Sequence, residues 1–344
     1  MRVLVTGHLG YIGSVLTSVL RHARFEVVGL DCDWYRGCDF GRVKSPVPSF
    51  DIDVRDVEFT DLLSFDAVVH LAGLSDDAAA DLDGDLTDSI NHAATVRLAE
   101  CCKRAGVSRF VFASSCSVYG RRGGALLDET AEPRPLTRYA RSKVRCEQDL
   151  ARLADDHFAP VFLRNATAYG VSPRLRADLV VNDFVASAVV SDQVVLKTNG
   201  ASFRPLVHVE DIARACAAVL SAPEEQVRSQ IFNIVPPGEN HRVIDIADAV
   251  AELLPHCTRS APAHGFDQRS YCADGLKFLR TFPRFSFRWT LPLGIRQLHL
   301  ALRAAGLTPG DFRSDRYRRV LRLQSLLEHG QVDAQLRRPS YAIA

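Results

Sequence analysis

Short apolar runs alternate with stretches of helical periodicity along the first part of the chain. The runs 2–6, 26–31, 66–70 and 109–113 have the composition of buried strands, and residues 86–105 place apolar side chains at helical spacing. Such alternation is typical of units in which each strand is followed by a helix. The pattern therefore predicts an α/β fold built on a doubly wound parallel sheet.

The pattern becomes mixed from Thr167 onward. Helical spacing over 178–190, 209–220 and 243–254 alternates with short strand patterns over 194–196 and 231–235. This mixture predicts a second, smaller and discontinuous α/β domain. We expect a first domain over 1–165, to which the chain returns at about 204–235. A smaller domain would comprise 166–203 and 236–310, and a helical extension would follow over 311–344.

The extension carries Arg and Leu at helical spacing over 311–337. An amphipathic helix packed on the body of the protein explains this stripe, and a partner-binding tail is the alternative.

Charge and cysteine usage exclude several classes of protein. The 344 residues carry 42 Lys and Arg against 41 Asp and Glu, so no basic field indicates nucleic-acid binding. No apolar run is long enough to span a membrane, and the sequence begins directly with a strand pattern rather than a signal peptide. Nine Cys without a paired C-x-x-C spacing fit neither a disulfide framework nor a zinc site. We therefore expect a cytoplasmic protein without a metal.

A glycine-rich turn follows the first strand pattern and opens a helix. Gly7, Gly10 and Gly13 would let the backbone turn sharply and approach a diphosphate at the helix N-terminus. Asp31 ends the second strand pattern, where a carboxylate accepts hydrogen bonds from ribose hydroxyls and repels a 2′-phosphate. This arrangement predicts a Rossmann-type cofactor domain that prefers NAD to NADP.

Further motifs occur in order along the chain: Asp53-Val54-Arg55-Asp56, His70-Leu71-Ala72-Gly73, Asn91, Ser114 to Gly120, Tyr139 to Lys143, and Arg204 to Asp211. Together with the glycine turn they resemble the extended short-chain dehydrogenase/reductase family, in its group of NAD-dependent sugar-nucleotide epimerases and dehydratases. The resemblance runs from residue 1 to about residue 305. The cofactor-binding residues that it implies are Gly7, Gly10, Tyr11, Ile12, Gly13, Asp31, Asp53, Val54, Leu71, Ala72, Gly73, Asn91, Ser114, Tyr139 and Lys143. The side chains of His8 and Tyr11 are assigned to packing or solvent.

Tyr139 and Lys143 are one helical turn apart, so both side chains project from one face. A nearby ammonium stabilises a phenolate and lowers the pKa of a tyrosine, which is otherwise about 10. Ser115 follows a strand pattern, where its hydroxyl could orient the reacting substrate oxygen. The resemblance implies that Tyr139 is the base, with Ser115 and Lys143 as the other two catalytic residues.

The residues after Ser115 narrow the reaction. The family's 4,6-dehydratases carry an Asp-Glu pair there, whereas this chain has Cys116 and Ser117, which replace carboxylic acids poorly. We therefore expect an epimerase of a nucleotide-linked sugar, acting most simply at carbon 4. The alternatives are an NAD(P)-dependent sugar dehydrogenase or ketoreductase with net redox change, and a non-catalytic NAD-binding regulator. The excess of Arg over Lys hints at a GC-rich bacterium and at sugar or antibiotic biosynthesis.

The substrate side departs from the family pattern. The position at which relatives place a diphosphate-binding Asn holds Thr167, while Asn165 lies two residues earlier and would point differently; His264 lies near the position of a phosphate-binding Arg. The expected substrate-binding residues are Ser115, Cys116, Ser117, Thr167, Arg174, Arg176, Asn182, Arg204 and Arg269. Asp76 and Asp77 follow a strand expected to line the cofactor cleft and could face the substrate, but they are interpreted as solvated loop acids, which are more frequent. The expected partners are a small-molecule nucleotide sugar and a second copy of the chain, paired through the helices near 86–105 and 137–155.

Overall fold

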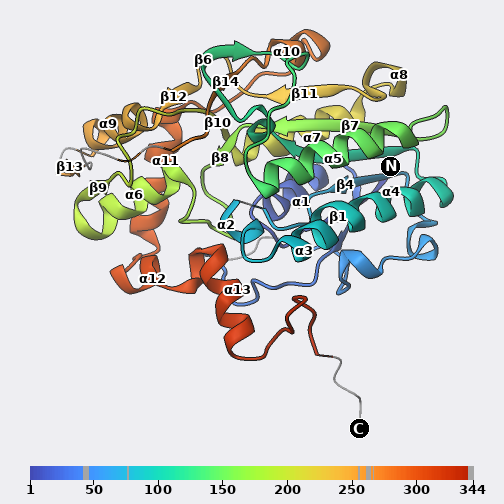
Figure 1. Ribbon diagram of the computed structural model, residues 1–344, viewed down its shortest axis with the longest axis horizontal. Helices are drawn as coiled ribbons and strands as arrows, with labels where there is room; N and C mark the ends of the chain where they lie inside the picture. Colours follow the sequence, from blue (N-terminus) through green and yellow to red (C-terminus); the bar gives the residue numbers. More distant parts are fainter. Residues whose placement is uncertain (42–45, 76, 255, 261–264, 266, 340–344) are drawn as a thin grey trace.

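The computed structural model describes residues 1–344 except 42–45, 76, 255, 261–264, 266 and 340–344. A seven-stranded parallel sheet forms the centre of the larger part (Figure 1). Its strands, in spatial order, are β11 (Ile231–Ile234), β7 (Ala159–Asn165), β5 (Arg109–Ser115), β4 (Ala67–His70), β1 (Arg2–Thr6), β2 (Glu26–Leu30) and β3 (Ser49–Phe50). The order reverses direction at β1, as in a doubly wound sheet. The predicted fold class is therefore confirmed.

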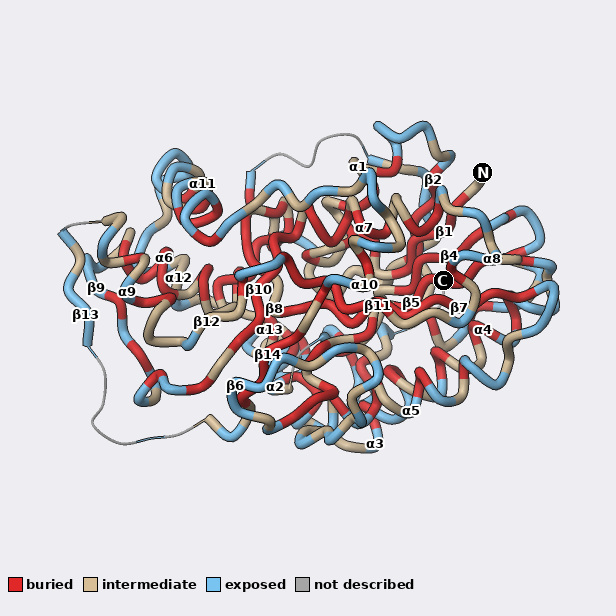
Figure 2. Tube along the Cα trace, turned by 90° about the horizontal axis from the view of Figure 1, so that it is seen from above, coloured by how far each residue is buried: buried red, intermediate tan, exposed pale blue. Residues whose placement is uncertain are grey.

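Alternate residues of each central strand enter different cores, because successive side chains of a strand point to opposite faces. Val3 and Val5 pack with α1 (Gly13–His22) and α7 (Val209–Ser221) on one face of the sheet. Leu4 packs with α4 (Ala94–Arg104) and α5 (Arg138–Leu153) on the other. Figure 2 shows the central strands buried and the outer helical surfaces exposed.

The smaller part lies beside the carboxyl ends of the strands and has three small sheets. They join β8 (Thr167–Tyr169), β10 (Phe203–His208) and β12 (Asn240–Arg242); β9 (Gln193–Val195) and β13 (Thr258–Ser260); and β6 (Arg121–Leu127) and β14 (Ser270–Ala273). Its main helices are α6 (Val180–Ser191), α9 (Val243–Leu253) and α11 (Leu291–Ala304). The chain thus returns to the large sheet through β11, whereas β10 stays in a small sheet, and the expected domain boundaries stay predictions.

Short helices complete the fold between these elements. They are α2 (Asp77–Ala80), α3 (Gly84–Thr87), α8 (Glu224–Val227), α10 (Leu276–Thr281), and the 3-10 turns η1 (Val54–Asp56), η2 (Phe59–Leu62) and η4 (Cys116–Tyr119). The helix expected near 86–105 is interrupted, because η3 (Asp88–Ala93) is a π-helical stretch between α3 and α4. Within the described residues, no helix is both long and apolar enough to cross a membrane.

The C-terminal extension differs from the single long helix that its spacing predicts. It forms α12 (Pro309–Arg313), the 3-10 turn η5 (Asp315–Tyr317) and α13 (Arg319–Glu328). Ser314 separates the first two because its side chain accepts a hydrogen bond from the Arg316 N–H. Gly330 follows α13 in a left-handed conformation that favours glycine. Figure 1 shows the extension, in red, crossing beneath both parts of the molecule.

Candidate active site

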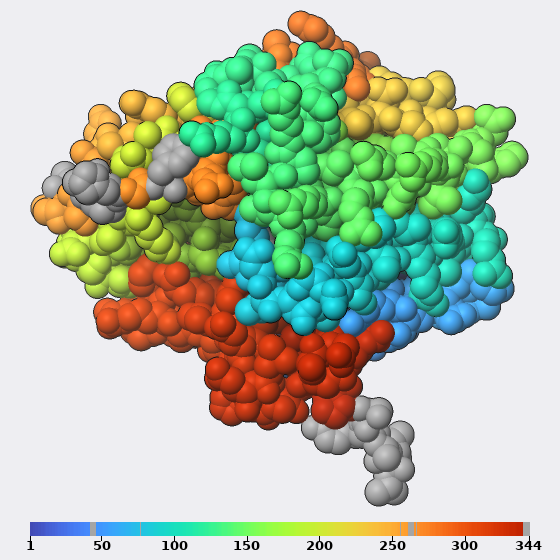
Figure 3. Space-filling model, viewed as in Figure 1, coloured from blue at the N-terminus to red at the C-terminus, as the bar shows by residue number. Residues whose placement is uncertain are grey.

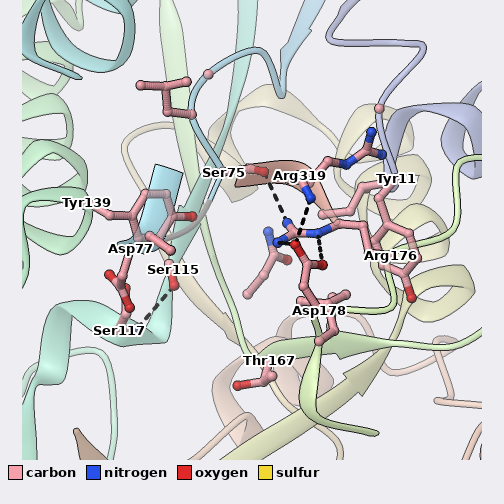
Figure 4. Close-up of a pocket in the computed structure, with 18 of the residues that line it drawn as sticks. Tyr11, Ser75, Asp77, Ser115, Ser117, Tyr139, Thr167, Arg176, Asp178 and Arg319 are labelled. Atoms are coloured by element: carbon pink, nitrogen blue, oxygen red, sulfur yellow. Dashed lines mark hydrogen bonds and ion pairs between the residues drawn. The ribbon is translucent and has the colours of Figure 1, made fainter. Parts of the chain in front are cut away.

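A cavity of about 800 Å³ opens at the carboxyl ends of β1, β2, β4 and β5. Its walls come from three regions: the glycine turn and the loops after these strands, the smaller part with Thr167 and Arg204, and the C-terminal extension with Arg318 and Arg319. Figure 4 shows side chains from these regions facing one another across the cavity. This is the position at which doubly wound sheets bind their ligands.

The glycine turn leaves no space for side chains at two of its positions. A Cβ on Gly7, whose φ is +70°, would lie 2.7 Å from the Ala72 nitrogen, and a Cβ on Gly13 would lie 2.2 Å from the Gly7 carbonyl oxygen. Ile12 occupies the N-cap of α1 and provides no side-chain acceptor for the N–H groups of the first turn. The turn therefore presents backbone donors and a positive helix end to the cavity, as a diphosphate requires.

Asp31 braces this turn. Its carboxylate accepts hydrogen bonds from the Leu9 N–H at 2.9 Å and the Asp33 N–H at 2.8 Å, and it lines the cavity. Burial raises the pKa of Asp31, and the two N–H donors oppose that rise. Next to it, His8 packs behind the turn against Gly29, where burial lowers the pKa of the imidazole.

Tyr11 connects the two parts of the molecule through its side chain. Its hydroxyl donates to the Gly170 carbonyl at 2.7 Å and accepts from Asn182 Nδ2 at 3.2 Å. Tyr11 is 6% exposed, so its ring packs as expected while the residue still borders the cavity.

Asp53, Val54 and the segment from Leu71 to Gly73 also line the cavity. The Asp53 carboxylate already accepts from the Arg55 side chain, at 2.9 Å from Nε and 2.6 Å from Nη2. Burial by itself would raise the pKa of Asp53, but its bonds to Arg55 bring that pKa below the ordinary value.

Ser115, Tyr139 and Lys143 meet on one side of the cavity. Thr137 caps α5 by accepting from the Ala140 N–H, which places Tyr139 in the first helical turn and Lys143 one turn later. The Lys143 ammonium donates to the Ala113 carbonyl at 2.8 Å and lies 5.6 Å from the centre of the Tyr139 ring. Burial lowers the pKa of Lys143 to about 8.

The Ser115 hydroxyl oxygen accepts from the Ser117 N–H at 3.1 Å, so its own proton stays available to a substrate oxygen. Figure 4 draws Tyr139, Ser115 and Ser117 together on one wall of the cavity.

Buried hydrogen bonds hold the strands beneath these groups. Ser114 donates to the Glu147 carboxylate at 2.5 Å, and Arg164 forms an ion pair with the same carboxylate at 2.7 Å. His70 lies between the hydroxyls of Thr6 and Thr95, where burial lowers its pKa to about 3 and keeps the imidazole neutral. Both networks position the strand ends that form the cavity floor.

Three of the four expected substrate-binding arginines reach the cavity: Arg176, Arg204 and Arg269. Each is already paired with a carboxylate, as the ion pairs show: Arg176–Asp178 at 2.9 Å, Arg204–Asp267 at 2.6 Å and Arg269–Asp267 at 2.8 Å. Thr167 and Ser117 also line the cavity. The carboxylates partly offset the positive charge that the sequence alone assigns to this half of the site.

Four expected site residues do not line the cavity. Cys116 is fully buried and its thiol donates to the Arg164 carbonyl, because η4 turns it beneath the sheet. Asn91 lies one layer below and holds the loop after β4 through both the N–H and the carbonyl of Leu74, at 2.7 and 3.0 Å. These two residues support the walls instead of forming them.

Arg174 and Asn182 are the other two. Arg174 forms ion pairs with Asp33 at 2.9 Å and Asp39 at 3.0 Å, so it fastens the loop after β2. Asn182 accepts from the Gly170 N–H and donates to Tyr11, so its amide is used in joining the two parts. The polar groups of both side chains serve internal partners in this structure, and their direct contacts with substrate stay predictions.

The structure adds residues to the site that were not among the expected ones. Asp77 lines the cavity and pairs with Arg269, so it is not a solvated loop acid. Asn165 also lines the cavity, and its buried Oδ1 has no hydrogen-bond partner among the described residues. Arg318 and Arg319 come from the C-terminal extension, where no local motif marks them. Asp76 and His264 lie outside the described residues.

Comparisons with known proteins agree with this geometry. The model of the NAD dependent epimerase/dehydratase family matches residues 3–235. The UDP-glucose epimerase YtcB of Bacillus subtilis, itself uncharacterized, is 28% identical in an alignment of 245 positions that covers 65% of this chain and 73% of YtcB. The UDP-glucose 4-epimerase of Yersinia pestis is 27% identical in an alignment of 312 positions that covers 80% of this chain and 90% of that enzyme. The structure of MoeE5 in complex with UDP-glucuronic acid and NAD has a TM-score of 0.77 and 28% identity, covering 89% of this chain and 100% of that one.

Proposed function

Because the chain belongs to the NAD dependent epimerase/dehydratase family, and is an NAD-dependent enzyme of the extended short-chain dehydrogenase/reductase type, we propose that it epimerises a nucleotide-linked sugar at carbon 4. One observation carries the choice of reaction. Ser115, Tyr139 and Lys143 meet at the cavity, while the two positions after Ser115 provide a buried thiol and a hydroxyl in place of carboxylic acids. The nearby Asp77 carboxylate is engaged with Arg269. Epimerisation needs the serine, tyrosine and lysine side chains, but it does not need the additional acid and base that eliminate water in a dehydratase.

Tyr139 and Ser115 would handle the reacting hydroxyl. Tyr139 Oη takes its proton, and the Ser115 hydroxyl donates to the same oxygen and fixes its direction. The NAD that the glycine turn and Lys143 would hold would supply the reversible hydride acceptor for the carbon that carries this oxygen. Tyr139 then gives the proton back, so protons and electrons balance over the cycle. The sugar must present its opposite face before the return step, and the cavity of about 800 Å³ leaves room for that rotation.

Lys143 would keep Tyr139 in the form that accepts a proton. Its buried ammonium lies 5.6 Å from the centre of the Tyr139 ring, and an adjacent positive charge favours the phenolate. A pKa of about 8 leaves Lys143 mostly charged near neutral pH.

The substrate class is supported by the cations of the cavity and by the relatives. Arg176, Arg204 and Arg269 border the half of the cavity formed by the smaller part, where a sugar diphosphate would lie. MoeE5 has been solved with UDP-glucuronic acid and also with UDP-glucose. We therefore include these two UDP-sugars among the first substrates to test.

The experiment is proton NMR of UDP-glucose and UDP-glucuronic acid with the purified protein and no added cofactor. We expect signals of the 4-epimer to appear until equilibrium is reached. The matched control is Tyr139→Phe, which keeps the ring but should reduce turnover by about two orders of magnitude or more while NAD stays bound.

Other outcomes decide against the proposal. A requirement for stoichiometric NAD(H) or NADP(H) would instead identify a dehydrogenase or ketoreductase. Bound NAD with no conversion of any sugar nucleotide would indicate a regulator. Full activity in Tyr139→Phe would remove Tyr139 as the base.

A further inference from the structure

The C-terminal extension packs on the loops that form the cofactor side of the cavity. Leu323 and Leu326 of α13 join one apolar cluster with Leu74, Leu86 and Ile90. Figure 3 shows the extension, in red, in contact with the segment in cyan that contains these loop residues. The extension therefore has a fixed position against the cavity, and the first residue of α13 borders the cavity directly.

That residue is Arg319, which is only 4% exposed. Its Nη2 donates to the Arg174 carbonyl at 3.2 Å, and its guanidinium carbon lies 3.6 Å from the centre of the Tyr35 ring. Its backbone N–H donates to Asp178 at 3.1 Å, which anchors the start of α13. Figure 4 shows the Arg319 side chain at the same end of the cavity as Tyr11 of the glycine turn.

Arg319 differs from the other arginines around the cavity in its charge balance. Arg176, Arg204, Arg269 and Arg318 each have a carboxylate partner. Across the described residues, no carboxylate forms an ion pair with the Arg319 guanidinium, whose contacts are the Arg174 carbonyl and the Tyr35 ring. A buried cation with no paired anion is costly unless a ligand provides the negative charge.

The glycine turn borders the same cavity as Arg319 and has no cation of its own directed into it. The turn presents N–H donors, but His8 is its sole residue with a basic side chain, and that ring packs against Gly29. The loop after β8 carries Arg174 and is held against the glycine turn, because Ser172 Oγ donates to the Tyr11 carbonyl at 2.7 Å and accepts from the Arg174 N–H. We propose that Arg319 binds the diphosphate of NAD, so that the C-terminal extension completes the cofactor site.

The test measures binding to the full-length protein after NAD has been removed, with ADP-ribose, adenosine and UDP as probes. In Arg319→Gln we expect the affinity for ADP-ribose to fall about tenfold or more, because a charge-assisted hydrogen bond to phosphate is lost. The affinity for adenosine, which lacks phosphate, should stay the same. UDP binding to the NAD-loaded variant should also stay the same, which separates the cofactor's diphosphate from that of the substrate.

Two variants serve as controls. Arg316→Gln removes the same charge from the same extension, at a side chain that pairs with Asp311 and does not line the cavity, and should leave ADP-ribose binding unchanged. Arg319→Lys keeps a cation and should retain more affinity than Arg319→Gln. Unchanged ADP-ribose binding in Arg319→Gln overturns the proposal, and a weakened UDP affinity alone would assign Arg319 to the substrate. An equal loss for adenosine would also overturn it.

If the Arg319 variants fail to fold, hydrogen exchange of the unchanged protein tests the same proposal. ADP-ribose should slow exchange of the backbone amides in α13, and adenosine should not. Equal protection by the two probes would contradict a diphosphate contact. The readout is binding, so its result does not depend on which sugar reaction the enzyme catalyses.

Discussion

Lys143 illustrates how a functional residue opposes folding. Its pKa is lowered from 10.5 to about 8 by burial, so the folded protein binds this proton less tightly than the unfolded chain does. The free energy of unfolding is therefore reduced most below pH 8, and the reduction fades as pH rises from about 8 towards 10.5. Lys143 thus favours activity at neutral pH at a cost in stability.

We predict that Lys143→Met abolishes turnover and gains stability relative to the unchanged protein near pH 7. The stability advantage of the variant over the unchanged protein should shrink by roughly 2–3 kcal/mol between pH 7 and pH 10, because the penalty for burying charged Lys143 fades. Urea titration of the nucleotide-free proteins at the two pH values measures it. A difference that does not change with pH would mean that Lys143 is not a buried cation.

Asp31 should set the preference between the two dinucleotides. Asp31→Asn keeps an acceptor for the Leu9 N–H but removes the charge that repels a 2′-phosphate, so the NAD-to-NADP affinity ratio should fall about tenfold. Titration of each dinucleotide into the stripped protein gives this ratio. Asp33→Asn is the control, since Asp33 lies two residues on and does not line the cavity. The cofactor argument fails if both variants keep the original ratio.

At the scale of elements, α13 should be held by its apolar face. Leu323 is fully buried and Leu327 is 36% exposed on the same helix. Leu323→Ala should lower the free energy of unfolding by about 2–4 kcal/mol and speed the loss of NAD on dialysis, because a buried leucine leaves a cavity. Leu327→Ala should change stability by less than about 0.5 kcal/mol. Urea titration compares them, and equal effects would show that α13 contributes little through this face.

Elements with strong local signals were predictable from the sequence. The strand 2–6 and the helix over 209–220 match β1 and α7 within a residue, because their periodicity and end residues agree with their packing. The π-helical stretch 88–93 was not predictable, since its extra residue per turn leaves no clear mark in the apolar spacing.

In the candidate site too, residues set by local motifs were predictable, whereas contacts made only by the fold were not. The glycine turn and the Tyr139–Lys143 pair depend on neighbours in sequence, so motifs locate them. Arg174 instead pairs with Asp33 and Asp39, more than a hundred positions away, and only the fold brings these charges together. Arg319 was not predicted as a site residue, because nothing near it in the sequence shows that the fold brings it to the cavity.

At the scale of the whole molecule, the expected homodimer through α4 and α5 stays a prediction. The predicted interface carries both signs of charge, because α5 exposes Arg138, Arg141, Arg145 and Arg152 while the neighbouring helical segments expose Asp85, Asp88 and Glu100, so opposite charges could pair across it. A pairing through it should therefore depend on ionic strength.

Light scattering should give twice the 38.0 kDa of the chain at low salt, and a smaller average mass at about 1 M salt. Arg141→Glu should shift the protein towards the monomer, whereas Arg296→Glu, an exposed residue on α11, should not. A mass of one chain at low salt would contradict the predicted dimer.

The contact between α13 and the glycine-turn side of the cavity has a consequence for biosynthesis. A ribosome releases the glycine turn long before Arg319, so a nascent chain with a folded parallel sheet would still expose Leu74, Leu86 and Ile90. These apolar side chains are covered only when α13 emerges. Full retention of the dinucleotide would then begin only after the ribosome has made α13, and a chain that terminates before α13 would keep an apolar surface exposed beside an incomplete nucleotide cleft.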